Sequence, residues 1–257
     1  MEINKLNEER LFDNNSSFQT AGRVNFNNSV SYDFPTNEAY KTLRTNILFC
    51  GTGVKTIVIT SSHANEGKST ISIELSKSLA DINKKTLLID ADMRKSVILK
   101  RSLKSQNILG LSELLSGQAD ISQVLYNTQN PNFDVIFSGR FPPNPVELIS
   151  SDNFKKNLEK FKQMYDYVII DSPPLGPVID AAVIATMCDG AIVVVAADET
   201  RYQEVASTKE QLNKSRCKIL GAIINEIDPK RTRRNNYYKK SYYYYAEKGV
   251  NPAKNKK

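Results

Sequence analysis

A short polar loop followed by a helical stretch carries the clearest chemical signal in the chain. The loop runs through Ser62 to Glu66 and leads into Gly67-Lys68-Ser69-Thr70. Backbone N–H groups at a helix start attract phosphate, a lysine reaches the β- and γ-phosphate oxygens, and the next hydroxyl can ligate Mg²⁺. Ser62 replaces the first glycine of the usual G-x-x-x-x-G-K-S pattern, but the strand–loop–helix context still predicts a phosphate site.

Three carboxylates follow apolar runs that resemble buried strands. Asp90 ends the run Thr86–Asp90 and Asp92 follows two residues later, while Asp171 ends the run Tyr167–Asp171. Since parallel strands end at one edge of a sheet, all three acids are expected near the phosphate loop. One acid beside Mg²⁺ is normal for an ATPase, and a second offers a base or acceptor for an attacking hydroxyl. Capping of a following helix is the simpler role left open for Asp90 and Asp92.

Short apolar runs alternate with helical stretches over the middle of the chain. The expected strands are 55–60, 86–90, 133–137, 167–171, 191–195 and 219–224, and a helix is expected over 69–81. Near-continuous Val, Ile and Leu strands indicate a buried sheet covered by helices on both faces. The sequence therefore predicts an α/β fold with a mostly parallel sheet, in one domain over residues 36–229.

Composition excludes several classes of protein. The chain has 257 residues, is 40% hydrophobic, and contains three cysteines and one histidine. The three scattered cysteines are typical of reduced thiols and argue against a disulfide framework. A single histidine argues against a His-based metal cluster. Without an apolar run of about 18 residues, and with a start unlike a secretory signal, a cytoplasmic protein is expected.

Six of the chain's 12 tyrosines fall within nine residues near its end. They are Tyr237, Tyr238, Tyr242, Tyr243, Tyr244 and Tyr245. Residues 230–257 also hold ten Lys or Arg and one acid, a net charge of +9 that leaves −2 for residues 1–229. Such a segment is poorly suited to a core, so an exposed, disordered tail is expected. With an ATP site on the same chain, the tail suggests a kinase that modifies itself; a basic end without chemistry is the other interpretation.

The N-terminal part divides into two segments. Residues 1–35 are rich in Asn, Ser, Glu and Lys and are expected to be an extended or disordered extension. Residues 37–49 have apolar positions at helical spacing. Glu38, Lys41 and Arg44 lie three residues apart, on the other side of that helix. From spacing alone they form a solvated charged face.

Four motifs occur in order along the chain: Ser61–Thr70, Leu87–Lys95, Ser138–Ile149 and Asp171–Gly176. Together they resemble the bacterial tyrosine kinase family, and more narrowly the cytoplasmic kinase of Gram-positive capsule or exopolysaccharide systems. The likeness extends from about Glu38 to the tail. The resemblance implies a P-loop fold related to septum-site and partitioning ATPases, and autophosphorylation of the tyrosine cluster.

The resemblance also implies roles for individual residues. Gly67, Lys68, Ser69 and Thr70 would hold Mg-ATP, Asp90 would engage the attacking tyrosine hydroxyl, and Asp92 and Asp171 would organise Mg²⁺ together with Ser69. Asn225 occupies a place where related ATPases often contact adenine, while a turn-forming asparagine is the alternative.

Assembly and location follow from the same resemblance. Glu38, Lys41 and Arg44 match an oligomerisation motif E-x-x-R-x-x-R, with a lysine where arginine is usual and so without its bidentate fork. The implied partners are further copies in a ring-like oligomer, a membrane adaptor and a phosphotyrosine phosphatase, with no nucleic acid. The implied location is the cytoplasm, at the inner face of the cell membrane.

Two other functions fit parts of the sequence. A spatial-organiser ATPase would share the scaffold, but such proteins place a second lysine early in the loop, where this chain has His63. A nucleic-acid binder would use the basic, aromatic tail as a stacking surface, which leaves the three aspartates without a role.

Overall fold

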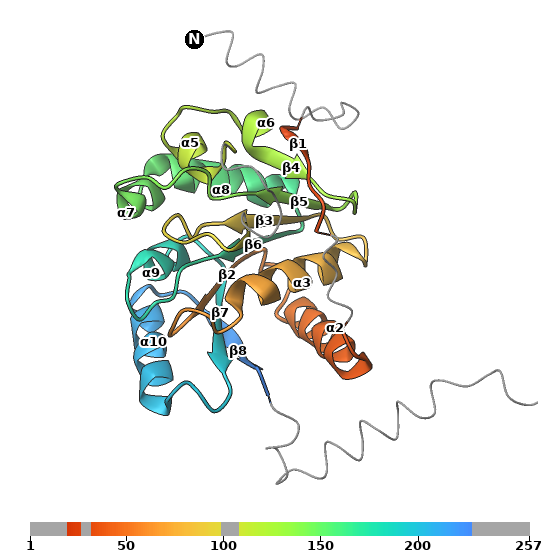
Figure 1. Ribbon diagram of the computed structural model, residues 1–257, viewed down its shortest axis with the longest axis vertical. Coiled ribbons are helices and arrows are strands. Elements are labelled where there is room, and N and C mark those ends of the chain that lie inside the picture. The colour runs from red at the N-terminus through yellow and green to blue at the C-terminus, as the bar shows by residue number, and fades with distance from the viewer. Residues whose placement is uncertain (1–19, 27–31, 99–107, 228–257) are drawn as a thin grey trace, which may run out of the picture.

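Eight strands form one sheet at the centre of the computed structural model, which describes residues 20–26, 32–98 and 108–227 (Figure 1). Their order is β1-β4-β5-β3-β6-β2-β7-β8. The strands are β1 (Gly22–Arg23), β2 (Thr56–Ser61), β3 (Thr86–Asp90), β4 (Leu125–Asn127), β5 (Phe133–Ile136), β6 (Tyr167–Asp171), β7 (Gly190–Ala196) and β8 (Ile219–Asn225). From β5 to β8 all neighbours are parallel, whereas β4 pairs antiparallel with β5.

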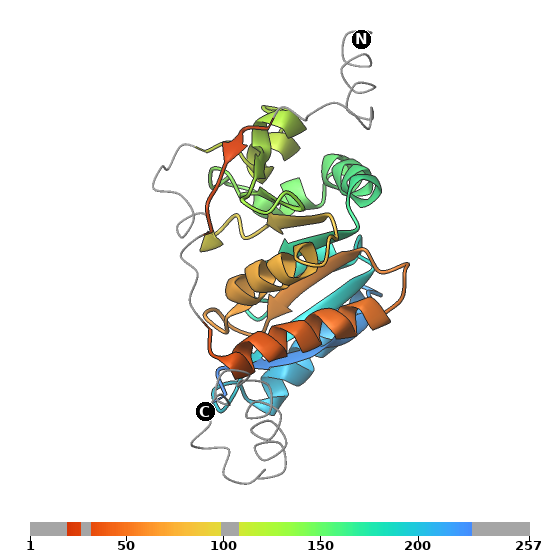
Figure 2. The same cartoon turned by 90° about the vertical axis from the view of Figure 1, so that its right-hand side faces the viewer.

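Helices cover both faces of this sheet (Figures 1 and 2). One layer holds α2 (Phe34–Phe49) and α3 (Lys68–Ala80); the other holds α5 (Leu111–Leu115), α6 (Ile121–Val124), α7 (Pro145–Ile149), α8 (Asp152–Met164), α9 (Asp180–Ala185) and α10 (Tyr202–Lys214). Successive strand residues pack alternately into the two cores: Ile57 packs on the α3 side of the sheet and Val58 on the other side. Because both faces are buried, the central strands are apolar throughout, as the sequence predicted.

Part of the predicted extension over residues 1–35 belongs to the sheet. Gly22–Arg23 forms β1 and pairs with β4 at the sheet edge. Val24 is 2% exposed, and the ring of Phe26 stacks on Phe133 with centroids 5.7 Å apart. A two-residue strand leaves no periodic pattern in the sequence, which is why this segment was missed. Residues 1–19 and the tyrosine cluster lie outside the described residues.

The predicted helix at residues 37–49 begins three residues earlier than expected. Asp33 caps it by accepting a hydrogen bond from the Thr36 N–H at 3.1 Å, and Pro35 fits the first turn. In the described part of the chain, no helix has the length and apolar character needed to cross a bilayer.

Asp189 joins three elements at the sheet edge where β2 and β7 begin. One carboxylate oxygen accepts hydrogen bonds from the N–H groups of Lys55 and Thr56, both at 2.9 Å, and the other accepts from Lys162 Nζ at 2.6 Å. Burial would raise the pKa of Asp189, but the bonds from Lys162 and the backbone outweigh it and lower the pKa. Ionised Asp189 therefore stabilises the fold more than protonated Asp189 does.

We expect Asp189→Asn to lower the free energy of unfolding by about 1–3 kcal/mol at pH 7, because it weakens a set of charge-assisted hydrogen bonds. A lowered pKa contributes stability above the unfolded pKa of about 3.9, and this stability is lost as pH falls through the folded value. The difference between wild type and Asp189→Asn should shrink below about pH 4. Urea unfolding at several pH values measures it, with the exposed Glu159→Gln as control. A constant difference down to pH 3 would contradict this account.

Candidate active site

The loop between β2 and α3, residues 62–67, is called here the phosphate loop. Gly67 ends it in a left-handed conformation, with φ 87° and ψ 10°, and caps α3. A Cβ at this position would strain the left-handed backbone and would lie 2.0 Å from Asn225 Nδ2, so any other residue would displace the Asn225 amide. The N-terminus of α3 is thereby left uncovered by a side chain, as phosphate binding requires.

Glu66 fixes the shape of the phosphate loop from inside. Its side chain is buried, at 3% exposure. One oxygen accepts a hydrogen bond from the His63 N–H at 2.7 Å, and the other accepts from the Thr200 hydroxyl and from the Ala196 N–H at 3.4 Å. The Glu66 carbonyl accepts a bond from Asn225 Nδ2 at 3.1 Å. The loop is therefore tied to the ends of β7 and β8.

Two further side-chain links join the phosphate loop to α10. The hydroxyls of Ser62 and Thr208 lie 2.9 Å apart in the interior. His63 Nε2 lies 3.2 Å from an oxygen of Glu204, near the start of the helix. Ser62, which replaces the usual glycine, thus has a structural role of its own.

Lys68 is the first residue of α3, and its side chain is 7% exposed. Its ammonium donates to the His63 carbonyl at 3.4 Å, folding back over the loop. Burial lowers the pKa of Lys68, while the charges of Asp171, Asp92 and Glu66 act in the opposite direction. The cation is therefore held where a phosphate would compensate its lost hydration.

Asp171 lies under the N-terminal turn of α3. Its side chain accepts a hydrogen bond from the Ser72 hydroxyl at 3.0 Å, and the nearby Ser69 side chain also favours the ionised carboxylate. Burial raises the pKa of Asp171 to about 6, although Ser69, Lys68 and Ser72 favour the ionised form. The carboxylate and the Ser69 hydroxyl form an oxygen-rich corner beside the buried lysine.

Asp90 is the register partner of Asp171 across β3 and β6. It is fully buried, and its oxygens accept hydrogen bonds from the Ser96 hydroxyl and, at 3.2 Å, from the Asp92 N–H. Burial and the nearby charge of Asp171 raise the pKa of Asp90 well above its ordinary value. Asp90 is held by a turn at the strand end and caps no helix.

Asp92 lies at the mouth of this group and is half-buried. One of its oxygens accepts from the N–H groups of Arg94 at 3.2 Å and Lys95 at 2.9 Å. The turn is held further by Arg94, whose guanidinium donates to both oxygens of the buried Asp180 at 2.8 and 3.1 Å. The strand end that carries Asp90 and Asp92 is thus tied to the start of α9.

The donors at this corner suit a hard cation such as Mg²⁺. Ser69 and Asp171 offer oxygen ligands, and no group of three or more His, Cys, Asp or Glu able to hold a metal occurs among the described residues. Mg²⁺ in nucleotide sites usually takes one or two protein oxygens, with water and phosphate completing its shell. The few oxygens present fit a metal that arrives with the nucleotide.

The charged residues of α2 do not behave alike. Lys41 and Glu38 form an ion pair of 2.7 Å on the outside of the helix. Arg44 instead donates to the Ser78 carbonyl at 3.0 Å and to its hydroxyl at 3.3 Å, so it fastens α2 to α3 within the chain. The expectation of one solvated charged face is therefore wrong for Arg44.

The motif Ser138–Ile149 follows β5 at the same sheet edge. The buried carboxylate of Glu113 accepts hydrogen bonds from the N–H groups of Gly110 at 2.8 Å and Arg140 at 3.2 Å. Gly139 has φ 76°, and a Cβ there would lie 2.1 Å from Glu113 Oε2. Glu113 therefore sets the turn that opens the motif.

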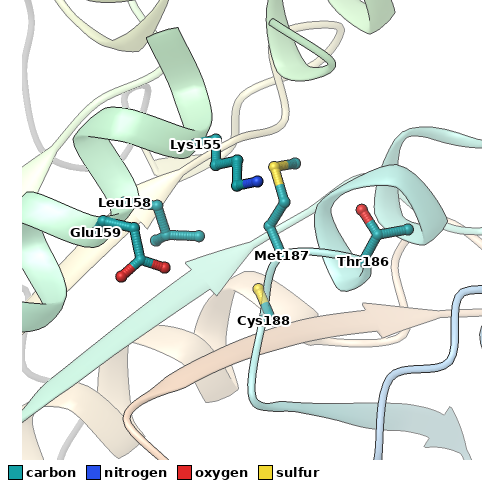
Figure 3. A pocket seen from close by; sticks show the side chains of 6 residues that line it. All are labelled: Lys155, Leu158, Glu159, Thr186, Met187 and Cys188. Atoms are coloured by element: carbon teal, nitrogen blue, oxygen red, sulfur yellow. The ribbon is translucent and has the colours of Figure 1, made fainter. Parts of the chain in front are cut away.

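A pocket of about 470 Å³ lies elsewhere in the molecule (Figure 3). It is lined by Lys155, Leu158, Glu159, Thr186, Met187 and Cys188. Cys188 precedes β7, so the pocket lies at the sheet edge opposite the phosphate loop. It contains none of the sequence-predicted site residues.

Comparison with known proteins agrees with this geometry. A family model described as an AAA domain matches residues 54–219. The tyrosine-protein kinase CpsD of Streptococcus agalactiae is 44% identical over 193 residues, which cover 75% of this chain and 84% of that protein. The chain belongs to the bacterial tyrosine kinase family. The tyrosine-protein kinase YwqD of Bacillus subtilis is 37% identical, over 74% of this chain and 80% of its own.

Solved structures agree with this assignment to the bacterial tyrosine kinases. The chimerical protein CapA2B2 superposes with a TM-score of 0.73 at 32% identity, over 81% of this chain and 94% of that one. The kinase domain of the Escherichia coli tyrosine kinase ETK superposes with a TM-score of 0.70 at 33% identity, over 74% of this chain and 75% of that one. The septum-site protein MinD of Pyrococcus horikoshii, at 23% identity and a TM-score of 0.55, shares the fold alone. The chain is a tyrosine-protein kinase with a P-loop fold.

Sequence reasoning missed the residues that hold the site together. Asn225 lies at the end of β8 rather than in a turn, and its amide donates to the Glu66 carbonyl in the phosphate loop; its contact with adenine stays a prediction. Glu66, Thr200 and Asp180 were not singled out. A charged Glu66 between small residues was the only available signal, and its partner Thr200 lies 134 residues away.

We expect Gly67→Ala to weaken Mg-ADP binding by more than tenfold, because Asn225 would have to move and release the Glu66 carbonyl. Gly117→Ala is the matched control: its φ is 73°, but a Cβ there meets nothing within 4 Å. Left-handed strain of about 1–2 kcal/mol should appear in both variants, and loss of binding only in Gly67→Ala. Calorimetric titration and thermal unfolding separate the two effects. Equal affinity in both variants would mean that the close approach at Gly67 is unimportant.

Proposed function

We propose that this tyrosine kinase transfers the γ-phosphoryl group of Mg-ATP to the tyrosines of its own C-terminal cluster, from one subunit to the next within an oligomer. The proposal rests above all on one observation: Asp90, Asp171 and the phosphate loop share one sheet edge. A phosphate cradle and a carboxylate on a neighbouring strand are the two parts that transfer to a hydroxyl requires.

The phosphate loop would receive the nucleotide. The N–H groups from Gly67 to Thr70 open α3 and would face the phosphates, and Lys68 would reach the β- and γ-oxygens. Ser69, Asp171 and Asp92 would hold Mg²⁺, whose charge stabilises the transferring phosphoryl group. The buried corner excludes water, which strengthens each of these charge interactions.

Asp90 would orient the tyrosine hydroxyl or take its proton. Tyrosine has an ordinary pKa of about 10, so the attacking phenol is mostly protonated at neutral pH. General bases work best when their pKa lies near the operating pH, and burial moves the pKa of Asp90 in that direction. The Ser96 hydroxyl, which donates to one Asp90 oxygen, would compete with the tyrosine hydroxyl for this carboxylate.

The tail would alternate between docking and release. Its net charge of +9 favours an acidic surface, and each phosphate adds about −1.5 to −2 charges. About four phosphorylated tyrosines would cancel most of the positive charge. Phosphorylation would then weaken tail docking and dissolve the oligomer.

The family resemblance supports a wider setting for this reaction. A membrane adaptor would bring the kinase to the inner face of the cell membrane and activate it, and a phosphotyrosine phosphatase would reverse the modification. The output would be control of capsular or exopolysaccharide synthesis and export.

Incubation with Mg-ATP, with and without an adaptor's cytoplasmic peptide, tests the reaction directly. We expect mass spectrometry to find phosphotyrosine confined to Tyr237–Tyr245, and none in Lys68→Met or in a variant with phenylalanine at all six tail tyrosines. Asp90→Asn should lower the rate by about 10²–10⁴-fold, the usual contribution of a general base. ATP hydrolysis without phosphotyrosine, even with the peptide, would favour a spatial-organiser ATPase instead.

The oligomer can be tested on α2. Exchange of the exposed Lys41 and Glu38 for alanine should reduce the assembly seen by light scattering and leave the melting temperature within a few degrees, since an exposed ion pair contributes about 0–1 kcal/mol. Arg44→Ala should lower the melting temperature, because it leaves α2 unfastened from Ser78. Unchanged assembly in the Glu38 and Lys41 variants would remove them from the interface.

A further inference from the structure

The carboxylate of Glu66 bridges two parts of the site that are far apart in the sequence. It joins the N–H of His63, inside the phosphate loop, to the N–H of Ala196 and the hydroxyl of Thr200, where β7 leads into α10. It is 3% exposed and lies directly before Gly67. The loop therefore has its nucleotide-accepting shape fixed by a side chain of its own.

Glu66 has the charge that such a bridge needs. Burial would raise its pKa, but the hydrogen bonds from His63, Thr200 and Ala196 help to outweigh burial and lower it, so the carboxylate stays ionised. Its charge also favours the protonated form of Lys68. An ionised carboxylate accepts hydrogen bonds about twice as strong as neutral ones.

The β7–α10 connection supplies the fixed end of the bridge. The Thr200 N–H donates to the Ala196 carbonyl at 3.2 Å, and the Ala197 N–H donates to the Asn225 carbonyl at 2.8 Å. Asn225 in turn donates to the Glu66 carbonyl. Glu66 is thus held through both its side chain and its backbone by two neighbouring strands.

We propose that Glu66 is a positioning residue for the kinase reaction and Thr200 its partner: together they preform the phosphate loop, and so set the affinity for Mg-nucleotide rather than the rate of transfer. Glu66 would not touch the nucleotide. The inference rests on the proposed function in one respect, that the phosphate loop binds Mg-nucleotide.

Four variants of the full chain test the bridge by calorimetric titration with Mg-ADP. Glu66→Gln replaces one acceptor oxygen with a donor facing an N–H or O–H group, and should raise the Kd about tenfold or more. Thr200→Val removes only the hydroxyl and should raise it about threefold to tenfold, while Thr200→Ser keeps the hydroxyl and should stay within twofold of wild type. The double variant Glu66→Gln/Thr200→Val should be no weaker than Glu66→Gln alone, because both changes break one bridge.

Kinetics distinguish positioning from catalysis. At saturating Mg-ATP, Glu66→Gln and Thr200→Val should keep kcat within twofold of wild type while KM for ATP rises with the Kd. Glu210→Gln, on the exposed side of α10, is the control and should change neither value. Thermal unfolding checks that each variant is folded; if Glu66→Gln does not fold, the isosteric Thr200→Val with its serine rescue carries the test.

Several outcomes would contradict the positioning role of Glu66. Unchanged Kd in folded Glu66→Gln and Thr200→Val, or fully additive losses in the double variant, would overturn the bridge. A fall in kcat at saturating ATP without a change in Kd would make Glu66 part of the chemistry and overturn the positioning role. Failure of the wild type itself to bind Mg-ADP would instead refute the proposed function.

Discussion

The register of three parallel strands is the constraint on which the whole site depends. β6 lies between β2 and β3 and places Asp171 beside Ile59 on one side and beside Asp90 on the other. The phosphate loop begins three residues after Ile59. Because side chains alternate along a strand, a slip of one residue would turn Asp90 and Asp171 away from α3. The sheet pairing therefore places Asp90 and Asp171 on the face of the sheet that α3 covers, at the edge where the phosphate loop begins.

This arrangement buries charged groups, and hydrogen bonds from nearby residues offset the free-energy cost of that burial. Buried carboxylates are tolerated only with hydrogen bonds or opposite charges. The Ser72 hydroxyl donates to Asp171, the Ser96 hydroxyl and the Asp92 N–H donate to Asp90, and the His63 N–H and the Thr200 hydroxyl donate to Glu66. Lys68 adds the one buried cation at this corner of the described structure. The small hydroxyl residues that look unremarkable in the sequence are what keep the acids in place.

Much of the fold could be predicted because it depends on local pattern. The runs at Thr86–Asp90 and Tyr167–Asp171 are strands with the expected bounds, and the shared edge of parallel strands brought Asp90 and Asp171 together as expected. β1 could not be found, because two residues carry no period. Glu66 was missed, and Arg44 was assigned to a solvated face, for a different reason. Their partners, Thr200 and Ser78, are brought to them by tertiary packing, and the spacing of residues along one helix or loop does not reveal such contacts.

A crystal structure of the chain with Mn²⁺-ADP is the most direct measurement of the central claim, because anomalous scattering locates the metal independently of the nucleotide. The account predicts the diphosphate on the N–H groups from Gly67 to Thr70, with the Lys68 ammonium on its oxygens. It predicts the Mn²⁺ peak at the Ser69 hydroxyl, on the side of Asp171. A nucleotide bound elsewhere, or a metal peak away from Ser69 and Asp171 with the phosphates in the loop, would contradict it.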